Sequence, residues 1–149
     1  MAILFYSTSD QYGALSNFSP HSIELDGISW PTVEHYFQAK KFHDETYREK
    51  IRLASNPKTA KTLGRSRKVP IRTDWEQVKD EIMLQACRAK FLAHNDVKEL
   101  LLSTGDEELI ENAANDYYWG CGRSGTGKNR LGEILMRVRD ELRTNNGCR

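Results

Sequence analysis

The sequence predicts an α+β fold: a single, mostly helical domain with a small β-sheet near the N-terminus. Residues 74–94 and 131–143 carry apolar side chains at the 3.6-residue spacing of core helices. Asp26-Gly27 lies between two short β-prone runs, which is a strong local signal for a hairpin. The 149 residues contain no repeat, low-complexity tract or linker. We therefore expect one domain over residues 1–149, with about 144–149 as a flexible tail.

The expected strands are residues 2–6 and the hairpin arms 22–25 and 28–30, and they form one small sheet to which 108–113 is a further candidate strand. The expected helices are residues 30–42, 45–54, 56–64, 74–94, 96–103 and 131–143. Asn56 caps the third of these, with Pro57 at its first position. Gly64 suits the position just after its end.

Charge and composition exclude several classes of protein. The 22 basic and 21 acidic residues nearly cancel, so no overall basic field favours nucleic acid. Apolar runs are far shorter than the roughly 20 residues of a membrane span, and residues 1–6 do not resemble a signal peptide. Three scattered cysteines favour a reducing cytoplasm over a disulfide framework. The histidines lack metal-ligand spacing, so we expect no metal and no cofactor.

The segment 30–42 is expected to form the wall of a pocket. Thr32 is a plausible N-cap for its helix. The apolar face carries Val33, Tyr36 and Phe37, and the polar edge beside it carries Glu34, Gln38 and Lys41. A surface helix more usually places such polar groups opposite its apolar stripe.

A second unusual segment, 115–130, holds four glycines beside Asp116 and Trp119. Residues 122–128 match the start of a phosphate-binding P-loop. The next residue is Asn129 rather than the Ser or Thr that would hold magnesium, so we do not expect a nucleoside triphosphatase. A weaker expectation is that this turn and the N-terminus of the last helix present N–H groups to a phosphate.

Three residues could supply chemistry. Glu34 and Asp116 form a candidate carboxylate pair that could stabilise an oxocarbenium-like cation. Glu34 lies near a helix N-terminus, which favours its ionised form and a base or electrostatic role. Lys41, if desolvated, could attack an aldehyde carbon. Spacing alone leaves the alternatives open, since the carboxylates could be caps and the lysine a surface residue.

Other residues could bind a ligand. Arg65 belongs to a locally basic stretch that is either an anion site or a solvated loop. Asn17 beside Phe18 could read the polar edge of a ring, or could simply form a turn. Trp75 could be a stacking platform at a pocket mouth or a plug in the core.

Together these stretches resemble the NADAR superfamily and its YbiA-like members, from residue 5 to about residue 141. The matching blocks are residues 5–10, 16–18, 30–39, 41–42, 64–65, 75, 89–91, 115–116, 118–120 and 127–132. Their number and order make the resemblance specific, and the Glu34 helix and the Trp119-Gly120 loop are the most distinctive blocks.

The resemblance implies an N-glycosidase. YbiA-like members cleave phosphoribosylamino-pyrimidine intermediates of riboflavin biosynthesis, and other members remove ADP-ribose from modified guanine. The family's functional positions match Glu34, Trp75, Asp116 and Trp119. Lys41 matches a motif lysine for which a Schiff-base role has been suggested, and Lys40 stands where relatives often carry Gln.

The expected function is hydrolysis of the ribosyl C–N bond of those pyrimidine intermediates. The catalytic candidates are Glu34, Asp116 and Lys41, and the substrate-binding candidates are Asn17, Phe18, Trp75, Trp119, Gly120, Arg65, Lys128 and Asn129. The expected partner is a small phosphoribosyl or ADP-ribosyl substrate. One alternative is a glycohydrolase that removes ADP-ribose from guanine in DNA or RNA. The other is a non-catalytic ADP-ribose or NAD binding module. Nothing in the sequence sets the oligomeric state.

Overall fold

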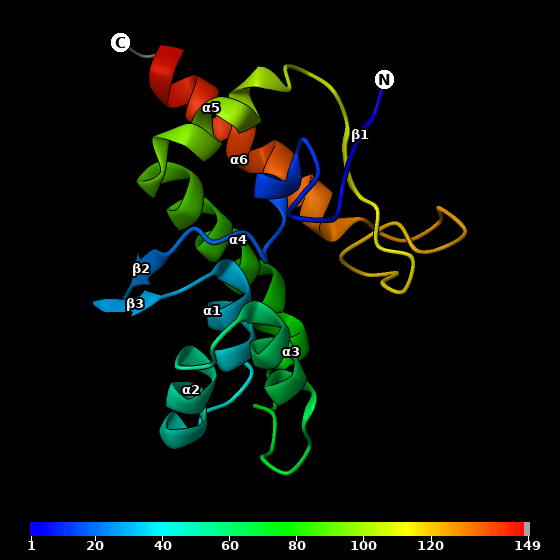
Figure 1. The fold of residues 1–149 in the computed structure, drawn as a ribbon. Helices are drawn as coiled ribbons and strands as arrows, with labels where there is room; N and C mark the ends of the chain where they lie inside the picture. The colour runs from blue at the N-terminus through cyan, green and yellow to red at the C-terminus, as the bar shows by residue number, and fades with distance from the viewer. Residues whose placement is uncertain (148–149) are drawn as a thin grey trace. The chain divides into compact units, whose positions relative to one another are not determined.

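The computed structural model describes residues 1–147 of the chain, with elements in the order drawn in Figure 1. The expected class is confirmed, since the chain is α+β and mostly helical, with short strands. Two compact units are present: Pro20–Lys90 forms one, and Met1–Ser19 together with the chain from Phe91 onward forms the other. We call them the central unit and the terminal unit.

The central unit begins with the predicted hairpin. Strands β2 (Ile23–Leu25) and β3 (Ile28–Trp30) pair antiparallel across the Asp26-Gly27 turn. Asp26 and Gly27 have φ values of 57° and 77°, the left-handed conformation that a two-residue hairpin turn requires. The hairpin leads directly into the first helix.

Helix α1 (Val33–Ala39) is buried along its whole length. Thr32 caps it as predicted, because its hydroxyl oxygen accepts from the His35 N–H at 3.1 Å. The His35 ring also anchors the helix start: Nε2 donates to the Ala54 carbonyl at 3.0 Å, and Nδ1 accepts from the Thr32 hydroxyl at 2.8 Å. Hydrogen bonds at both ring nitrogens of His35 therefore fix the start of α1.

The other end of α1 comes earlier than expected, at Ala39 rather than Phe42. The Lys41 N–H bonds three residues back, to Gln38 at 3.3 Å, so the chain tightens into a turn there. The Arg72 backbone N–H then binds the Lys41 carbonyl at 2.8 Å. Lys41 thus follows the helix and is held by the backbone of a later segment.

Helices α2 (Glu45–Arg52) and α3 (Pro57–Arg65) both contact α1. Asn56 caps α3 with Pro57 in its first turn, as predicted. The expectation for Gly64 was wrong: it lies inside the last turn of α3, not after the helix end. A Cβ at this position would collide with the Gln38 side chain, so packing rather than a left-handed conformation calls for glycine here.

Helix α4 (Trp75–Ala93) is the longest helix in the described part of the chain and follows the ion pair between Arg72 and Asp74. It passes from the central unit into the terminal unit near Lys90. No described helix combines the length and the apolar character needed to cross a bilayer.

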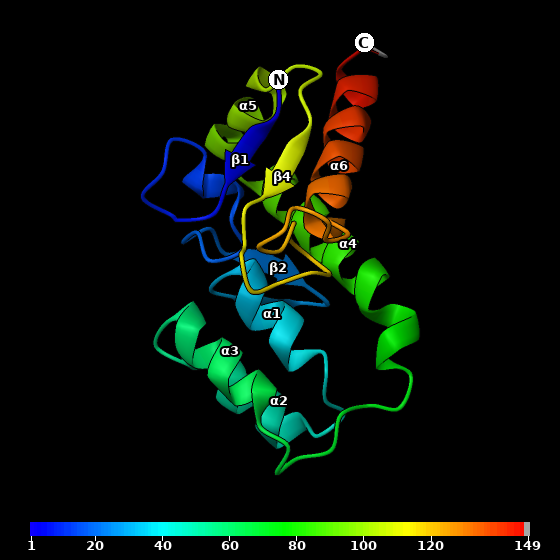
Figure 2. The same ribbon diagram turned by 90° about the vertical axis from the view of Figure 1, so that its right-hand side faces the viewer.

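In the terminal unit, strands β1 (Ile3–Phe5) and β4 (Leu109–Glu111) pair in parallel and lie side by side in Figure 2. A short 3₁₀ helix, η1 (Gly13–Leu15), contacts α5 (Asn95–Ser103). The expectation of a single sheet was wrong, because the described chain forms two separate two-stranded sheets. The hairpin closes on itself, and β1 instead pairs with a strand about a hundred residues downstream.

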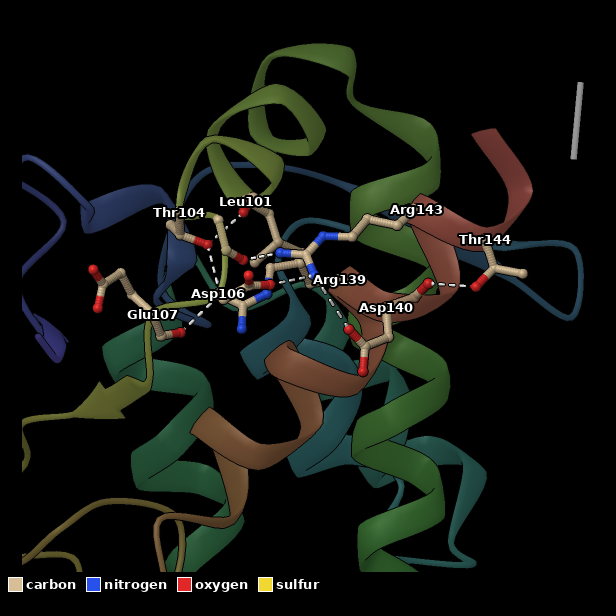
Figure 3. A network of polar contacts seen from close by, with 9 residues as sticks. Leu101, Thr104, Asp106, Glu107, Arg139, Asp140, Arg143 and Thr144 are labelled. Atoms are coloured by element: carbon tan, nitrogen blue, oxygen red, sulfur yellow. Dashed lines mark hydrogen bonds and ion pairs between the residues drawn. The ribbon is translucent and has the colours of Figure 1, made fainter. Parts of the chain in front are cut away.

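Helix α6 (Arg130–Gly147) packs against β4 and α5. Figure 3 shows how two arginines fasten it to the segment after α5. The buried Arg139 donates to the Thr104 hydroxyl at 2.8 Å and to the Glu107 carbonyl at 2.9 Å, and Arg143 pairs with Asp106 at 2.9 Å. Helix therefore covers most of the expected tail, and residues 148 and 149 lie outside the described part of the chain.

Candidate active site

Glu34 is a buried carboxylate, only 7% exposed, on the first turn of α1. Its Oε2 accepts a hydrogen bond from Gln38 Nε2 at 2.6 Å, one turn later on the same helix. Burial raises the pKa of Glu34, although the Gln38 bond and the charges of Lys61, Lys41 and Arg65 act in the opposite direction. The raised pKa differs from the ionised form that the helix N-terminus led us to expect for Glu34.

Lys41 is the amine next to this carboxylate. Its Nζ donates to the Gly64 carbonyl at 3.5 Å. Burial lowers the pKa of Lys41 to about 8; Glu34 opposes this shift, and the charges of Arg67, Arg65 and Lys61 reinforce it. A measurable fraction of the side chain is therefore unprotonated, and so nucleophilic, near neutral pH.

The other cations that act on Glu34 or Lys41 come from the end of α3 and the turn after it. Arg65 is exposed, and Lys61 lies one helical turn before it. Arg67 donates to the Gly64 carbonyl at 3.2 Å. Lys61 was not predicted as a site residue, although its spacing of four residues from Arg65 on a capped helix was a signal that could have found it. Such a group of cations is suited to binding an anion.

Trp75 begins α4 and is buried. Its ring packs against Phe37 of α1, with centroids 5.0 Å apart and planes tilted by 56°. This contact joins α1 to α4 within the central unit. The stacking role expected for Trp75 toward a substrate stays a prediction.

In the terminal unit, Asp116 shapes the loop that carries Trp119. Its Oδ1 accepts from the backbone N–H groups of Tyr118 and Trp119 at 2.9 and 2.8 Å. Within the described chain, Oδ2 has no hydrogen bond. The half-buried Trp119 ring meets the Tyr118 ring edge to face at 4.8 Å. The Asp116 carboxylate thus has one oxygen in a structural turn and the other available.

Backbone carbonyls of the same loop also bind the N–H groups at the start of α6. The backbone N–H groups of Asn129, Arg130 and Leu131 donate to the carbonyls of residues 120, 118 and 119 at 3.0 to 3.1 Å. The expectation that this helix N-terminus presents its first N–H groups to a phosphate was therefore wrong. Gly120 is buried, and a Cβ there would lie 2.8 Å from the Cβ of Ala113, so this close approach requires glycine.

Asn129 and Lys128 have different surroundings. The Asn129 side chain accepts from the Glu111 N–H at 3.0 Å and donates to the Leu109 carbonyl at 2.9 Å, which braces β4 against the start of α6. Lys128 is exposed, and its Nζ lies 5.6 Å from the centre of the Tyr118 ring. Asn17 is buried and Phe18 half-buried in the turn after η1, where the Phe18 N–H donates to Ser16 Oγ at 3.1 Å.

The structure thus sorts the predicted residues into two groups. The central unit holds Glu34, Lys41, Arg65 and Trp75, and the terminal unit holds Asn17, Phe18, Asp116, Trp119, Gly120, Lys128 and Asn129. A buried carboxylate and a lysine of lowered pKa that act on each other electrostatically are typical of an enzyme that uses acid–base or nucleophilic chemistry.

Comparison with known proteins places the chain in a family. Residues 4–143 match the NADAR domain, and the chain belongs to that family. It is 54% identical over 140 residues to N-glycosidase YbiA of Shigella flexneri serotype 5b, covering 94% of this chain and 88% of that protein. It is 47% identical over 146 residues to N-glycosidase Npun_R5314 of Nostoc punctiforme, covering 96% and 94% of the two chains.

A solved structure agrees with these relatives. The NMR structure of the Escherichia coli protein YbiA matches with a TM-score of 0.90 and 52% identity, covering 97% of this chain and 86% of that one. The chain is also 42% identical over 155 residues to the maize riboflavin biosynthesis protein PYRR, of which it covers 25%. With N-glycosidases among its close relatives, the chain is an N-glycosidase, a hydrolase acting on N-glycosyl bonds.

Proposed function

We propose that this enzyme hydrolyses the ribosyl C1–N bond of phosphoribosylamino-pyrimidine intermediates of riboflavin biosynthesis. The observation that carries the proposal is the buried Glu34 carboxylate, on which the charges of Lys41, Lys61 and Arg65 act. Two relatives, from maize and Vibrio vulnificus, are named riboflavin biosynthesis proteins and are 42% and 43% identical to the chain. They support a substrate from that pathway.

The proposed reaction balances as a hydrolysis. The C1–N bond breaks while positive charge develops at C1, water supplies the oxygen of the new C1–O bond, and a proton goes to the leaving nitrogen. The products are ribose 5-phosphate and the free aminopyrimidine. Ionised Glu34 stabilises the cation or accepts the proton of water, and protonated Glu34 delivers a proton to the leaving nitrogen.

Lys41 offers a covalent variant of the same reaction. A ring-opened N-ribosyl amine is an imine, and an unprotonated lysine can replace the pyrimidine amine at C1. Water then releases ribose 5-phosphate and regenerates the lysine. The lowered pKa of Lys41 supports this route, because it supplies free amine near neutral pH.

The remaining candidates would bind the substrate or assist the reaction. Arg65 and Lys61 are the proposed contacts of the phosphate, and Lys128 is a further proposed contact of the substrate. Trp75 and Trp119 are the proposed stacking residues for the base or ribose, and Asn17, Phe18, Gly120 and Asn129 are further proposed contacts. Asp116 is the proposed second carboxylate, acting through its Oδ2.

The assay offers each protein a phosphoribosylamino-pyrimidine and, separately, an oligonucleotide with ADP-ribosylated guanine. We expect the wild type to release aminopyrimidine and ribose 5-phosphate much faster than ADP-ribose. Faster release of ADP-ribose would favour the alternative nucleic-acid substrate instead. The near-neutral net charge of +1 gives little help to polynucleotide binding and supports the small substrate.

A further inference from the structure

We propose that Gln38 is a positioning residue, which holds the Glu34 carboxylate in place through its side-chain amide and is itself fixed by contact with Gly64. The inference rests on the proposed function, in which Glu34 is catalytic. The place of Gln38 on the polar edge of α1 was predicted, but no catalytic or binding role was predicted for it.

The amide of Gln38 has one orientation. Its Nε2 donates to Glu34 Oε2 at 2.6 Å, and the side chain is only 5% exposed. Its Oε1 is buried and has no hydrogen-bond partner within the described chain. While Glu34 is ionised, rotating the amide by half a turn would place Oε1 against the carboxylate oxygen, where two acceptors repel each other. The carboxylate therefore selects the orientation that leaves Oε1 unpaired.

Gly64 provides the space for this orientation. A Cβ there would overlap Gln38 Oε1, and it would lie 2.7 Å from Cδ and 3.0 Å from Cβ of the same side chain. Glycine inside a helix and an unpaired buried acceptor both lower stability. Both are present at one contact between α1 and α3, where they keep the amide aimed at Glu34.

The same glycine also borders the amine. Its carbonyl accepts from Lys41 Nζ at 3.5 Å and from Arg67 at 3.2 Å. Gln38 and Gly64 therefore connect the carboxylate and the amine of the proposed site within one packed contact. A shift of this contact would move both groups.

Removing the amide donor has a predictable electrostatic effect. Gln38 stabilises the ionised form of Glu34, together with Lys41 after α1 and with Lys61 and Arg65 from α3, against the effect of burial. Without this donor the ionised form of Glu34 is less stabilised, so burial raises the pKa of Glu34 further and the group titrates at a higher pH. A purely structural residue would change stability without moving this titration.

The test compares Gln38→Met, which keeps the length of the side chain, with Gly64→Ala and the double variant. Thr62→Ala, an exposed position on α3, is the matched control. The readouts are circular dichroism for folding, the pH profile of kcat, and a ¹³C NMR titration of the glutamate carboxyls. We expect both single variants to move the Glu34 titration up by about one pH unit and to change kcat on the affected limb by about tenfold.

The double variant should resemble the single ones, because both changes disturb the same amide. A folded Gln38→Met protein with the wild-type pH profile and NMR titration would overturn the inference. Loss of activity in Glu34→Gln with an unchanged profile in Gln38→Met would defeat only the positioning role. Wild-type activity in Glu34→Gln would defeat the proposed function itself. If Gly64→Ala does not fold, the pH profiles and NMR titrations of Gln38→Met and Gln38→Leu still test the positioning role of Gln38.

Discussion

Asp116 Oδ1 accepts a 2.8 Å hydrogen bond from the backbone N–H of Trp119, and a second bond from the N–H of Tyr118. A residue expected to be catalytic is therefore also part of the turn that presents the tryptophan. The two roles use different features of the side chain: the turn needs an acceptor oxygen, and the chemistry needs a negative charge.

Substitution at Asp116 separates these roles. Asn keeps an acceptor oxygen and loses the charge, so Asp116→Asn should fold like wild type and lose about 100-fold or more in kcat. Asp116→Ala leaves two N–H groups without their acceptor and should also lose about 1–3 kcal/mol of unfolding free energy. Urea titration and steady-state kinetics measure the two effects. Full activity in Asp116→Asn would show that Asp116 stabilises the turn and has no catalytic role.

Lys41 should be the preferred site of imine formation. Incubation with ribose 5-phosphate and cyanoborohydride should add one reduced adduct, located by peptide mass spectrometry. Burial lowers the pKa of Lys41 to about 8, so its free-amine fraction rises from about a tenth at pH 7 to about half at pH 8. Labelling should rise by the same factor of about five across that interval.

Lys40 is the matched control for this experiment. It is adjacent in sequence, and its Nζ lies 5.7 Å from the centre of the Tyr36 ring. Lys41→Arg should abolish the adduct, and Lys40→Arg should leave it unchanged. Equal labelling of the two lysines, or labelling that stays constant between pH 7 and 8, would contradict a special reactivity of Lys41.

The cations of α3 should decide affinity for phosphate. A charge-assisted hydrogen bond contributes about 1.5–3 kcal/mol, so Lys61→Ala or Arg65→Ala should raise KM for the phosphorylated substrate about 10- to 100-fold. KM for the dephosphorylated riboside should change little. Lys58→Ala, an exposed lysine on the same helix, is the control. An equal effect on both substrates would show that these residues do not bind the phosphate.

Asn129 gives a test of stability. Its side chain makes two hydrogen bonds to the backbone of β4, and its φ of 52° is a conformation that Asn tolerates better than Ala. We expect Asn129→Ala to lose about 1–3 kcal/mol of unfolding free energy, from two partly buried hydrogen bonds and the strained backbone. A stable variant with a raised KM would instead favour the substrate contact that the sequence suggested.

Much of the fold was predictable from short-range sequence patterns. The Asp26-Gly27 hairpin and the caps at Thr32 and Asn56 were all predictable, because each depends on residues within one turn. The pairing of β1 with β4 was not, since nothing in either short strand specifies a partner so distant in sequence. Gly64 was misplaced for the same reason: its neighbour is Gln38, on another helix.

In the site, too, features set by neighbouring residues were predictable and features set by distant residues were not. Helical spacing placed Glu34, Gln38 and Lys41 at one edge of an aromatic face, and the structure has these side chains in contact or in electrostatic interaction. Burial was not predictable, because it depends on what covers the helix. Burial raises the pKa of Glu34, where the helix N-terminus had led us to expect the ionised form, and it lowers the pKa of Lys41 to about 8.

The central claim is that Glu34 drives cleavage of the ribosyl C–N bond. The most direct measurement is release of aminopyrimidine from a phosphoribosylamino-pyrimidine by wild type and by Glu34→Gln, with binding followed separately. Gln is nearly isosteric and cannot exchange protons, so we expect kcat to fall by about 10²–10⁴ while substrate still binds. Glu34→Gln that turns over this substrate at the wild-type rate would contradict the account.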